Sequence, residues 1–272
     1  MRIGDLDLLP MSDGTFVARP AYFTRGPVPD PPPAPFGRDG VAWLPIGCFL
    51  IRTGDRVVLV DAGLGPAWDD LPDGMALVGG QLPAALLAGG TRPEDVTDVV
   101  CTHLHADHVG WLFDRDGRTV FPAATLWFGA ADGAHFIDED GGGEMADHVR
   151  AGFRGGATDA KPVDGDHTVA PGVDIVATPG HTPGHLAVVV SDGGDRAILV
   201  GDAITCPVQL AEPTWHSFGD VDPEQAGRSR ELLWAELARP GTVGTGAHFP
   251  ELRFGRVAGH AGGHAGGRVW SA

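Results

Sequence analysis

Hydrophobic residues fall into short β-branched runs separated by turn-forming residues, a pattern typical of β-strands. Residues 41–63, VAWLPIGCFLIRTGDRVVLVDAG, contain two such runs joined at Thr53-Gly54-Asp55, which predicts a β-hairpin. Residues 185–203 repeat the pattern, and GDRVVLVDA at 54–62 nearly matches GDRAILVGDA at 194–203. The sequence therefore predicts two similar halves, each built around a hairpin.

Helix signals lie between and after these hairpins. Leu82–Ala88 favours a helix, and Thr91–Glu94 has capping-box spacing with proline in the first turn. Asp222–Gln225 caps a longer helix whose inward face holds Ala226, Ser229, Leu233 and Leu237. Apolar runs at Val96–Cys101 and Thr242–Gly246 predict strands. The repeated order of strand pair, helix and strand predicts an α/β fold with two mixed β-sheets flanked by helices, an αββα sandwich.

A proline-rich stretch divides the chain near its beginning. Residues 20–40, PAYFTRGPVPDPPPAPFGRDG, hold too many prolines for a helix or a central strand. We therefore expect residues 1–40 to form an N-terminal arm and residues 41–272 to form a single domain. Two roles for the arm stay open: it covers the mouth of an active site, or it reaches a second subunit in a homodimer.

Composition excludes several classes of protein. With 43% apolar and 20% charged residues, the chain is expected to be globular, and the sequence has no apolar run long enough to span a membrane. A net charge of −17 disfavours nucleic acid and membrane surfaces as partners. The start MRIGDLDLLP lacks the pattern of a secretory signal, and the three cysteines form no CxxC motif. A cytoplasmic location is expected.

The chemistry of the chain centres on His103-Leu104-His105-Ala106-Asp107-His108 at the end of a predicted strand. Residues two apart can project to one side, so His103 and His105 can share one ion while Asp107 and His108 face a neighbouring one. Imidazole and carboxylate ligands without thiolates suit zinc, manganese, iron or cobalt in an open, catalytic site.

This HxHxDH motif resembles that of the metallo-β-lactamase-fold hydrolase superfamily, and the likeness runs from about Val41 to Val257. Later residues match the rest of its ligand pattern: His181 in TPGHTPGH, Asp202 in ILVGDA and His248 in GTGAHFP. The resemblance implies a metallo-β-lactamase fold and two divalent metal ions, with zinc expected first. It assigns His103, His105 and His181 to the first ion, Asp107, His108 and His248 to the second, and Asp202 to a bridge between them.

A bridging aspartate, together with residues 178–256, resembles the lactonase and methyl-parathion-hydrolase-like subgroup. Lactonases of the best-known type carry, three residues beyond that aspartate, a tyrosine that supports the substrate oxyanion, where this chain has Thr205. Acyl homoserine lactones are therefore expected to be poor substrates. His185 is expected to support the metal ligands rather than to bind metal.

The resemblance and the residues together predict a dinuclear-metal hydrolase of a carboxylic ester or lactone, with a metal-bridging hydroxide as the nucleophile. Asp107 would orient this hydroxide and pass a proton to the leaving group. Phosphotriester hydrolysis, thioester hydrolysis and a non-catalytic metal-binding role are the alternatives. Aromatic residues near the ligands indicate a small, hydrophobic, ester-like substrate, and the expected pocket residues are Trp111, Thr205 and His216.

Overall fold

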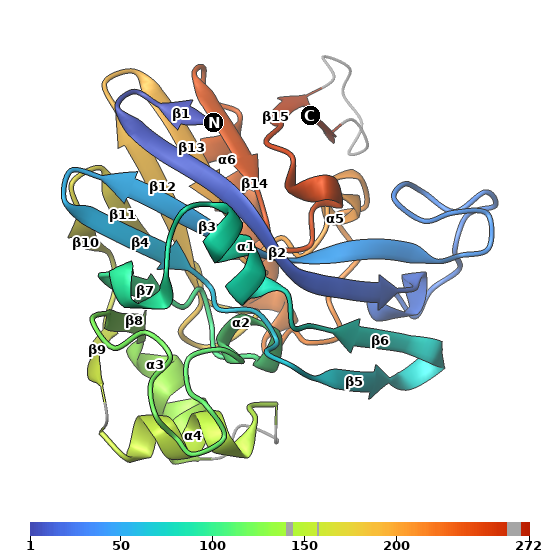
Figure 1. The fold of residues 1–272 in the computed structure, drawn as a ribbon. Coiled ribbons are helices and arrows are strands. Elements are labelled where there is room, and N and C mark those ends of the chain that lie inside the picture. Colours follow the sequence, from blue (N-terminus) through green and yellow to red (C-terminus); the bar gives the residue numbers. More distant parts are fainter. Residues whose placement is uncertain (140–143, 157, 260–267) are drawn as a thin grey trace.

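Two β-sheets pack face to face in the computed structural model, which describes residues 1–139, 144–156, 158–259 and 268–272 (Figure 1). The larger sheet has the strand order β5-β6-β2-β3-β4-β7-β8-β9, with β1 paired to β2. Its strands are β1 (Arg2–Ile3), β2 (Leu6–Ala18), β3 (Ala42–Thr53), β4 (Arg56–Val60), β5 (Trp68–Leu71), β6 (Met75–Val78), β7 (Asp98–Val100), β8 (Thr125–Gly129) and β9 (Asp159–Val163). The smaller sheet has the order β10-β11-β12-β13-β14. Its strands are β10 (His167–Ala170), β11 (Val173–Ala177), β12 (Leu186–Asp192), β13 (Asp195–Leu199) and β14 (Thr242–Thr245).

Both predicted hairpins are present, and each continues in the same way. β3 pairs antiparallel with β4, and β12 pairs antiparallel with β13. The second strand of each hairpin then pairs in parallel with a later strand, β4 with β7 and β13 with β14. The predicted likeness of the two halves is thus present in the sheet topology, and both sheets are mixed.

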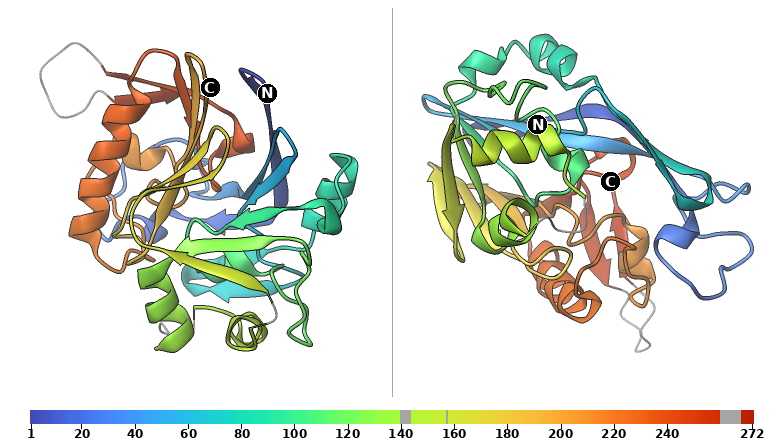
Figure 2. Two further views of the ribbon diagram at one scale, coloured as in Figure 1. Left: turned by 90° about the vertical axis from the view of Figure 1, so that its left-hand side faces the viewer. Right: turned by 90° about the horizontal axis from the view of Figure 1, so that it is seen from below.

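Helices cover the outer faces of both sheets, which confirms the predicted αββα sandwich. The helices are α1 (Leu82–Ala88), α2 (Ala106–Val109), α3 (Ala130–Asp132), α4 (Asp147–Arg154), α5 (Val208–Ala211) and α6 (Pro223–Leu237). In Figure 2, α6 flanks the sandwich on one side and α1 on the other. A small sheet of β15 (Arg256–Gly259) and β16 (Arg268–Ser271) follows near the C-terminus. In the described parts of the chain, no helix is long and apolar enough to cross a membrane.

Apolar side chains fill the layers of this sandwich. Between the sheets, Phe49 and Val58 of the larger sheet pack with Val188 and Leu199 of the smaller one. A second cluster lies under α1 and a third under α6, where the predicted face of α6 is buried. The α6 cap is also as predicted, because the Asp222 carboxylate accepts the Gln225 N–H at 2.9 Å.

The helix start predicted at Thr91–Glu94 is only a single 3₁₀ turn, Pro93–Asp95 (η3). Arg92, rather than Thr91, stands at its N-cap, and its N–H donates to the Asp95 carboxylate at 2.9 Å. Val96 then takes an extended conformation, so the chain leads directly into β7 instead of continuing as a helix.

The first 40 residues do not form one arm. β2 pairs with β3 from Asp7 to Ala18, so this segment belongs to the larger sheet. The loop proper follows β2 and begins with a 3₁₀ turn, Pro20–Tyr22 (η1). Phe23 and Phe36 of this loop are buried against Leu44 of β3, which anchors the loop to the sandwich. The homodimer stays a prediction.

Candidate metal centre

Side chains from both halves gather at one end of the sandwich, where several strands end. In the described chain they form three groups whose possible ligand atoms lie within 4.8 Å of one another. The groups are His103, His105 and His181; His103, His108 and Asp202; and Asp107, His108 and His248. The structure therefore brings together all seven side chains that the sequence indicated as ligands.

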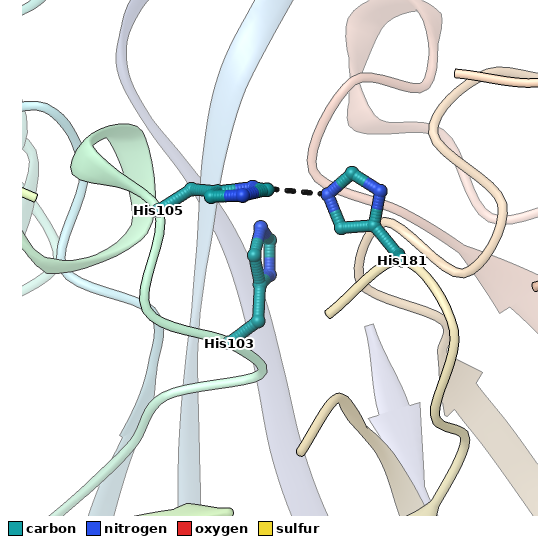
Figure 3. A group of neighbouring side chains, drawn as sticks. All are labelled: His103, His105 and His181. Atoms are coloured by element: carbon teal, nitrogen blue, oxygen red, sulfur yellow. Dashed lines mark hydrogen bonds between the residues drawn. The ribbon is translucent and has the colours of Figure 1, made fainter. Parts of the chain in front are cut away.

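The first cluster consists of imidazoles alone (Figure 3). His103 and His105 follow β7, and His181 lies in the loop between β11 and β12. Nδ1 of His105 lies 3.1 Å from Nε2 of His181, the contact drawn as a dashed line in Figure 3. With two ring nitrogens so close, the cluster must hold either a shared proton or a cation.

The second cluster combines imidazole with carboxylate. Nε2 of His248 lies 3.3 Å from Oδ2 of Asp107, and Nε2 of His108 lies 3.7 Å from the same oxygen. Asp107 and His108 lie on the short helix α2, and His248 follows β14. A mixed nitrogen and oxygen donor set of this kind suits zinc and similar transition metals.

Asp202 lies between the two clusters. One carboxylate oxygen is 3.8 Å from Nε2 of His181 and 3.6 Å from Nε2 of His248, and the other is 3.7 Å from Nε2 of His108. Asp202 follows β13, which lies between β12 and β14 in the smaller sheet. Its position is that of a carboxylate able to bridge two ions.

The outer nitrogen of each ligand histidine is already committed, which leaves the inner nitrogen free for a cation. The Thr102 hydroxyl donates to Asp61 at 2.9 Å, so it must accept from Nδ1 of His103, 3.1 Å away. Nδ1 of His108 is 2.9 Å from the Asp61 carboxylate, and Nδ1 of His248 is 2.7 Å from the Pro45 carbonyl oxygen. Such anchoring fixes the tautomer that presents Nε2.

The remaining two histidines follow the same rule with different outer partners. Nδ1 of His181 lies 2.9 Å from Asp220, which in turn accepts from Arg230 at 3.3 Å. His105 is reversed, because its Nε2 lies 3.2 Å from Glu144 and its Nδ1 faces the centre.

Three buried atoms in the described structure lack any hydrogen-bond partner at this centre: Nε2 of His103, Nε2 of His108 and Oδ1 of Asp202. Leaving a buried polar atom unpaired costs about 1–3 kcal/mol, and more if it is charged. All three atoms belong to the predicted ligand set and face one another. The residues present therefore fit a pair of cations.

Sequence reasoning missed the outer partners Asp61, Glu144 and Asp220. The sequence does contain a signal for Asp61, because it follows an apolar run in VVLVDA just as Asp202 does in ILVGDA of the other half. Its backbone has φ 60°, an uncommon value for a residue other than glycine, and aims the carboxylate at the site. Asp220 and Glu144 lie in loops, and their sequence neighbours carry no comparable signal.

The charge around each cluster sets the protonation of its histidines. Burial and the neighbouring imidazoles hold the pKa of His103 well below its usual range, and the same causes lower the pKa of His181 to about 3. Burial alone would also lower the pKa of His108, but nearby carboxylates, first Asp107 and then Asp61, raise it to about 10. His103 and His181 of the first cluster are thus neutral, whereas His108 of the second holds a proton that a cation would replace.

A cavity of about 540 Å³ opens onto this centre. Its lining includes His105, Asp107, Asp202 and His248 together with apolar side chains, among them the aromatic ring of Trp68. The lining residues are Phe16, Tyr22, Trp68, Asp69, Asp70, Leu71, Leu77, His105, Ala106, Asp107, Glu144, Ala146, Asp202, Phe218, Gly219 and His248.

The three side chains expected in the substrate pocket lie elsewhere. The Trp111 indole packs against the core and donates to Asp13 at 2.8 Å, because the chain turns inward after α2. Thr205 is fully buried, and its hydroxyl donates to the Asp202 carbonyl oxygen at 3.2 Å. His216 is exposed and contacts Arg230 at 2.9 Å, on the outer side of the ligand loops.

Comparison with known proteins gives a consistent result. The family model of the metallo-beta-lactamase superfamily matches residues 41–248. An N-acyl homoserine lactonase of Bacillus thuringiensis is 25% identical over 205 residues, covering 70% of this chain and 75% of that protein. A probable metallo-hydrolase of Mycobacterium tuberculosis is 34% identical over 182 residues, covering 57% of this chain and 55% of that protein.

Solved structures share the fold over nearly the whole chain. AidC, described as a dizinc quorum-quenching lactonase, has a TM-score of 0.84 at 23% identity, covering 100% of this chain and 95% of AidC. The hydrolase AbOPH, described as belonging to the beta lactamase superfamily, has a TM-score of 0.77 at 23% identity, with 99% and 95% covered. The architecture of this chain is therefore the metallo-beta-lactamase fold.

Proposed function

Since the chain belongs to the metallo-beta-lactamase superfamily, we propose that it is a dinuclear metal-dependent hydrolase of carboxylic esters or lactones. The observation that carries the proposal is the hydrogen bonding of the five ligand histidines through their outer nitrogens. It turns their inner nitrogens toward the centre that holds Asp107 and Asp202. The N-acyl homoserine lactonases among its relatives support the same reaction class.

We assign the seven ligands as two sets that share one carboxylate. The first set is His103, His105 and His181, the second is Asp107, His108 and His248, and Asp202 bridges them. Nitrogen and oxygen donors without sulfur make zinc the expected metal, with manganese, iron and cobalt as alternatives. The chemistry supplied by the bound ions is activation of water at neutral pH and polarisation of a carbonyl oxygen.

Asp107 is the proton carrier in this proposal. Its carboxylate lines the cavity, and Oδ2 lies 3.3 Å from His248 at the edge of the second cluster. Burial alone would raise the pKa of Asp107, but His108 and His248 hold it well below its usual range. The ionised carboxylate can orient the attacking water, accept its proton and deliver that proton to the departing oxygen of the substrate.

The cavity walls favour a small substrate with an apolar acyl group. Phe16, Leu71, Leu77 and Phe218 supply apolar surface beside the polar centre. Asp69 and Asp70 also face this cavity, and together with the net charge of −17 they disfavour anionic substrates. An uncharged ester or lactone satisfies both conditions.

A substrate panel tests the proposal. Purified protein, with its metal content measured, is assayed on aryl esters, lactones including an acyl homoserine lactone, thioesters and aryl phosphotriesters, before and after treatment with a chelator. We expect the highest kcat/KM on an aryl ester or an activated lactone and loss of turnover on metal removal. A kcat/KM higher on a phosphotriester or thioester than on any ester or lactone would show that the proposed substrate class is wrong. A metal-loaded protein that hydrolyses none of them would contradict the proposal.

A further inference from the structure

The single tyrosine of the chain, Tyr22, lies in the cavity of the metal centre. It ends the 3₁₀ turn η1 in the loop after β2, far in sequence from the metal ligands. The same cavity is lined by Asp107, Asp202 and His248. The loop therefore contributes a polar side chain to the site.

Aromatic contacts and a backbone hydrogen bond hold the Tyr22 ring in one orientation. Its centroid lies 4.9 Å from that of Phe16 and 5.0 Å from that of Phe23, both at edge-to-face angles. The Phe218 N–H donates to the Tyr22 carbonyl oxygen at 2.7 Å, which joins this loop to the loop before α6. A ring so enclosed has little freedom to turn its hydroxyl away.

The Tyr22 hydroxyl faces the first metal cluster. A Cβ atom placed on Gly219 would lie 3.5 Å from Oη of Tyr22, 3.2 Å from Cε1 of His181 and 3.5 Å from Cε1 of His105. Three groups from separate segments thus surround one point, and the absence of a side chain at Gly219 keeps the space between them open. A substrate oxygen beside the first cluster would be within reach of this hydroxyl.

The phenol proton is available to a substrate. Burial, reinforced by the charges of Asp202 and Asp107, raises the pKa of Tyr22 far above the working range, so the hydroxyl stays protonated. The neighbouring Ser217 side chain acts in the opposite direction on the pKa of Tyr22, but burial outweighs it.

Two other neutral donors near the metal centre are already used. The Trp68 indole N–H donates to Asp70 at 2.9 Å. The Thr205 hydroxyl donates to the Asp202 carbonyl oxygen and is buried away from the cavity. Asp107 lies in the second cluster, beside His248, and the proposed function gives it the proton of the leaving group.

We propose that Tyr22 is a catalytic residue whose phenol donates a hydrogen bond to the carbonyl oxygen of the substrate as negative charge develops there. This inference rests on the proposed function, because it names a further residue of the same site. A donor aimed at developing charge lowers the barrier without a covalent step, and loss of one such donor costs about 100-fold in rate.

The kinetic test compares Tyr22→Phe with the wild type on aryl esters whose leaving phenols have graded pKa values. The variant keeps the ring and its packing, so melting temperature and metal content are expected to be unchanged. We expect kcat to fall about 100-fold with KM altered much less, and by the same factor across the series, because every substrate develops charge on its carbonyl oxygen. Thr24→Val, which removes a hydroxyl from the same loop outside the cavity, is expected to match the wild type.

A second readout needs no turnover. Because the chain has one tyrosine, labelling with tyrosine carrying carbon-13 at Cζ gives a single resonance that reports on Tyr22. Butylphosphonate, a tetrahedral oxyanion, serves as the probe with metal-loaded protein. We expect it to shift this resonance and to bind Tyr22→Phe about tenfold more weakly than it binds the wild type or Thr24→Val.

Each outcome decides the assignment. Kinetic and binding constants within twofold of the wild type for Tyr22→Phe would overturn it. So would a kinetic defect that grows with the pKa of the leaving phenol, since the donor would then serve the leaving oxygen. If the wild type hydrolyses no substrate, the proposed function fails, while the resonance and the butylphosphonate affinities still decide whether Tyr22 donates to an oxyanion.

Discussion

Nε2 of His185 accepts the backbone N–H of Asp202 at a distance of 3.0 Å. The same nitrogen accepts the N–H of Ala203 at 3.1 Å, so Nδ1 must carry the ring proton and donate to the Thr178 hydroxyl at 2.8 Å. Burial and neighbouring imidazoles keep the pKa of His185 well below its usual range. A neutral imidazole therefore holds the backbone that carries the bridging carboxylate, in keeping with the supporting role predicted for it.

Replacing His185 by alanine should destabilise the fold. The change leaves the N–H groups of Asp202 and Ala203 buried without an acceptor, so we expect the free energy of unfolding to fall by about 2–4 kcal/mol. His185→Gln, which keeps an acceptor oxygen, should recover part of the loss. Urea unfolding followed by circular dichroism measures both, and a loss below about 1 kcal/mol for His185→Ala would contradict the role of this contact.

Removal of the shared carboxylate should disturb both metal sites. We expect the wild type to carry about two transition-metal ions per chain, and Asp202→Ala to retain less than one, because each site loses a ligand. Asp195→Ala, an exposed change at the start of the strand that leads to Asp202, should retain both ions. Elemental analysis decides, and equal metal contents for the two variants would refute the bridging assignment.

The proton-carrying role of Asp107 can be separated from its role as a ligand. Asp107→Asn keeps the size of the side chain and one donor oxygen but cannot accept a proton. We expect kcat to fall by about 10²–10⁴ while most of the metal is retained. If the variant keeps both metals and nearly full turnover, Asp107 is a ligand only.

Metal affinity should depend on pH more strongly at one cluster than at the other. His108, with its pKa raised to about 10, is protonated at neutral pH, and the pKa of His248 is also raised. A cation must displace such protons, so affinity should rise with pH, about tenfold per pH unit for each proton released. The first cluster contains His103 and His181, whose pKa values are lowered, so these two ligands release no protons and its affinity should change less with pH from 6 to 8.

Zinc titration against a competing chromophoric chelator at several pH values provides the measurement. If the metal affinities of the two sites had the same pH dependence, the neighbouring carboxylates would not be keeping the histidines of the second cluster protonated.

A buried carboxylate away from the centre should govern stability. Asp13 on β2 accepts the N–H groups of Leu64, Gly65, Gly80 and Leu82 at 2.8–3.2 Å, and that of the Trp111 indole at 2.8 Å. Asp13→Asn places an amide NH₂ against donors, and we expect the free energy of unfolding to fall by about 2–4 kcal/mol.

Asp7→Asn, an exposed change on the same strand, is the control for Asp13→Asn and should lie within about 0.5 kcal/mol of the wild type. Urea unfolding gives both values. Similar free energies of unfolding for the two variants would show that the hydrogen bonds of Asp13 do not stabilise the fold.

Much of this architecture could be predicted because its signals are local. The turns at Gly54 and Gly194, the β-branched runs around them and the cap at Asp222 each lie within a few residues of the element they define. The ligand histidines were also recognisable, since the HxHxDH spacing lies within six residues. The structure brings these side chains close together.

What could not be predicted depends on contacts between distant segments. The proline content of residues 20–40 indicated a loop but not that Tyr22 would enter the cavity, which is decided by packing against Phe16 and Phe218. Trp111, three residues after His108, was expected in the pocket by proximity in sequence. Its indole instead donates to the buried carboxylate of Asp13, which is distant in sequence.

Each proposed ion would be held by both halves of the chain, since the ligands from His103 to His108 follow strand β7 and the others follow strands of the smaller sheet. The three cysteines, all within the described residues, are free, so no disulfide joins the halves. Bound ions would close long loops between them in the manner of a cross-link and restrict the unfolded chain. A chelator would then act on this protein as a reductant acts on a disulfide-linked one: it would remove the bonds that fasten one sheet to the other.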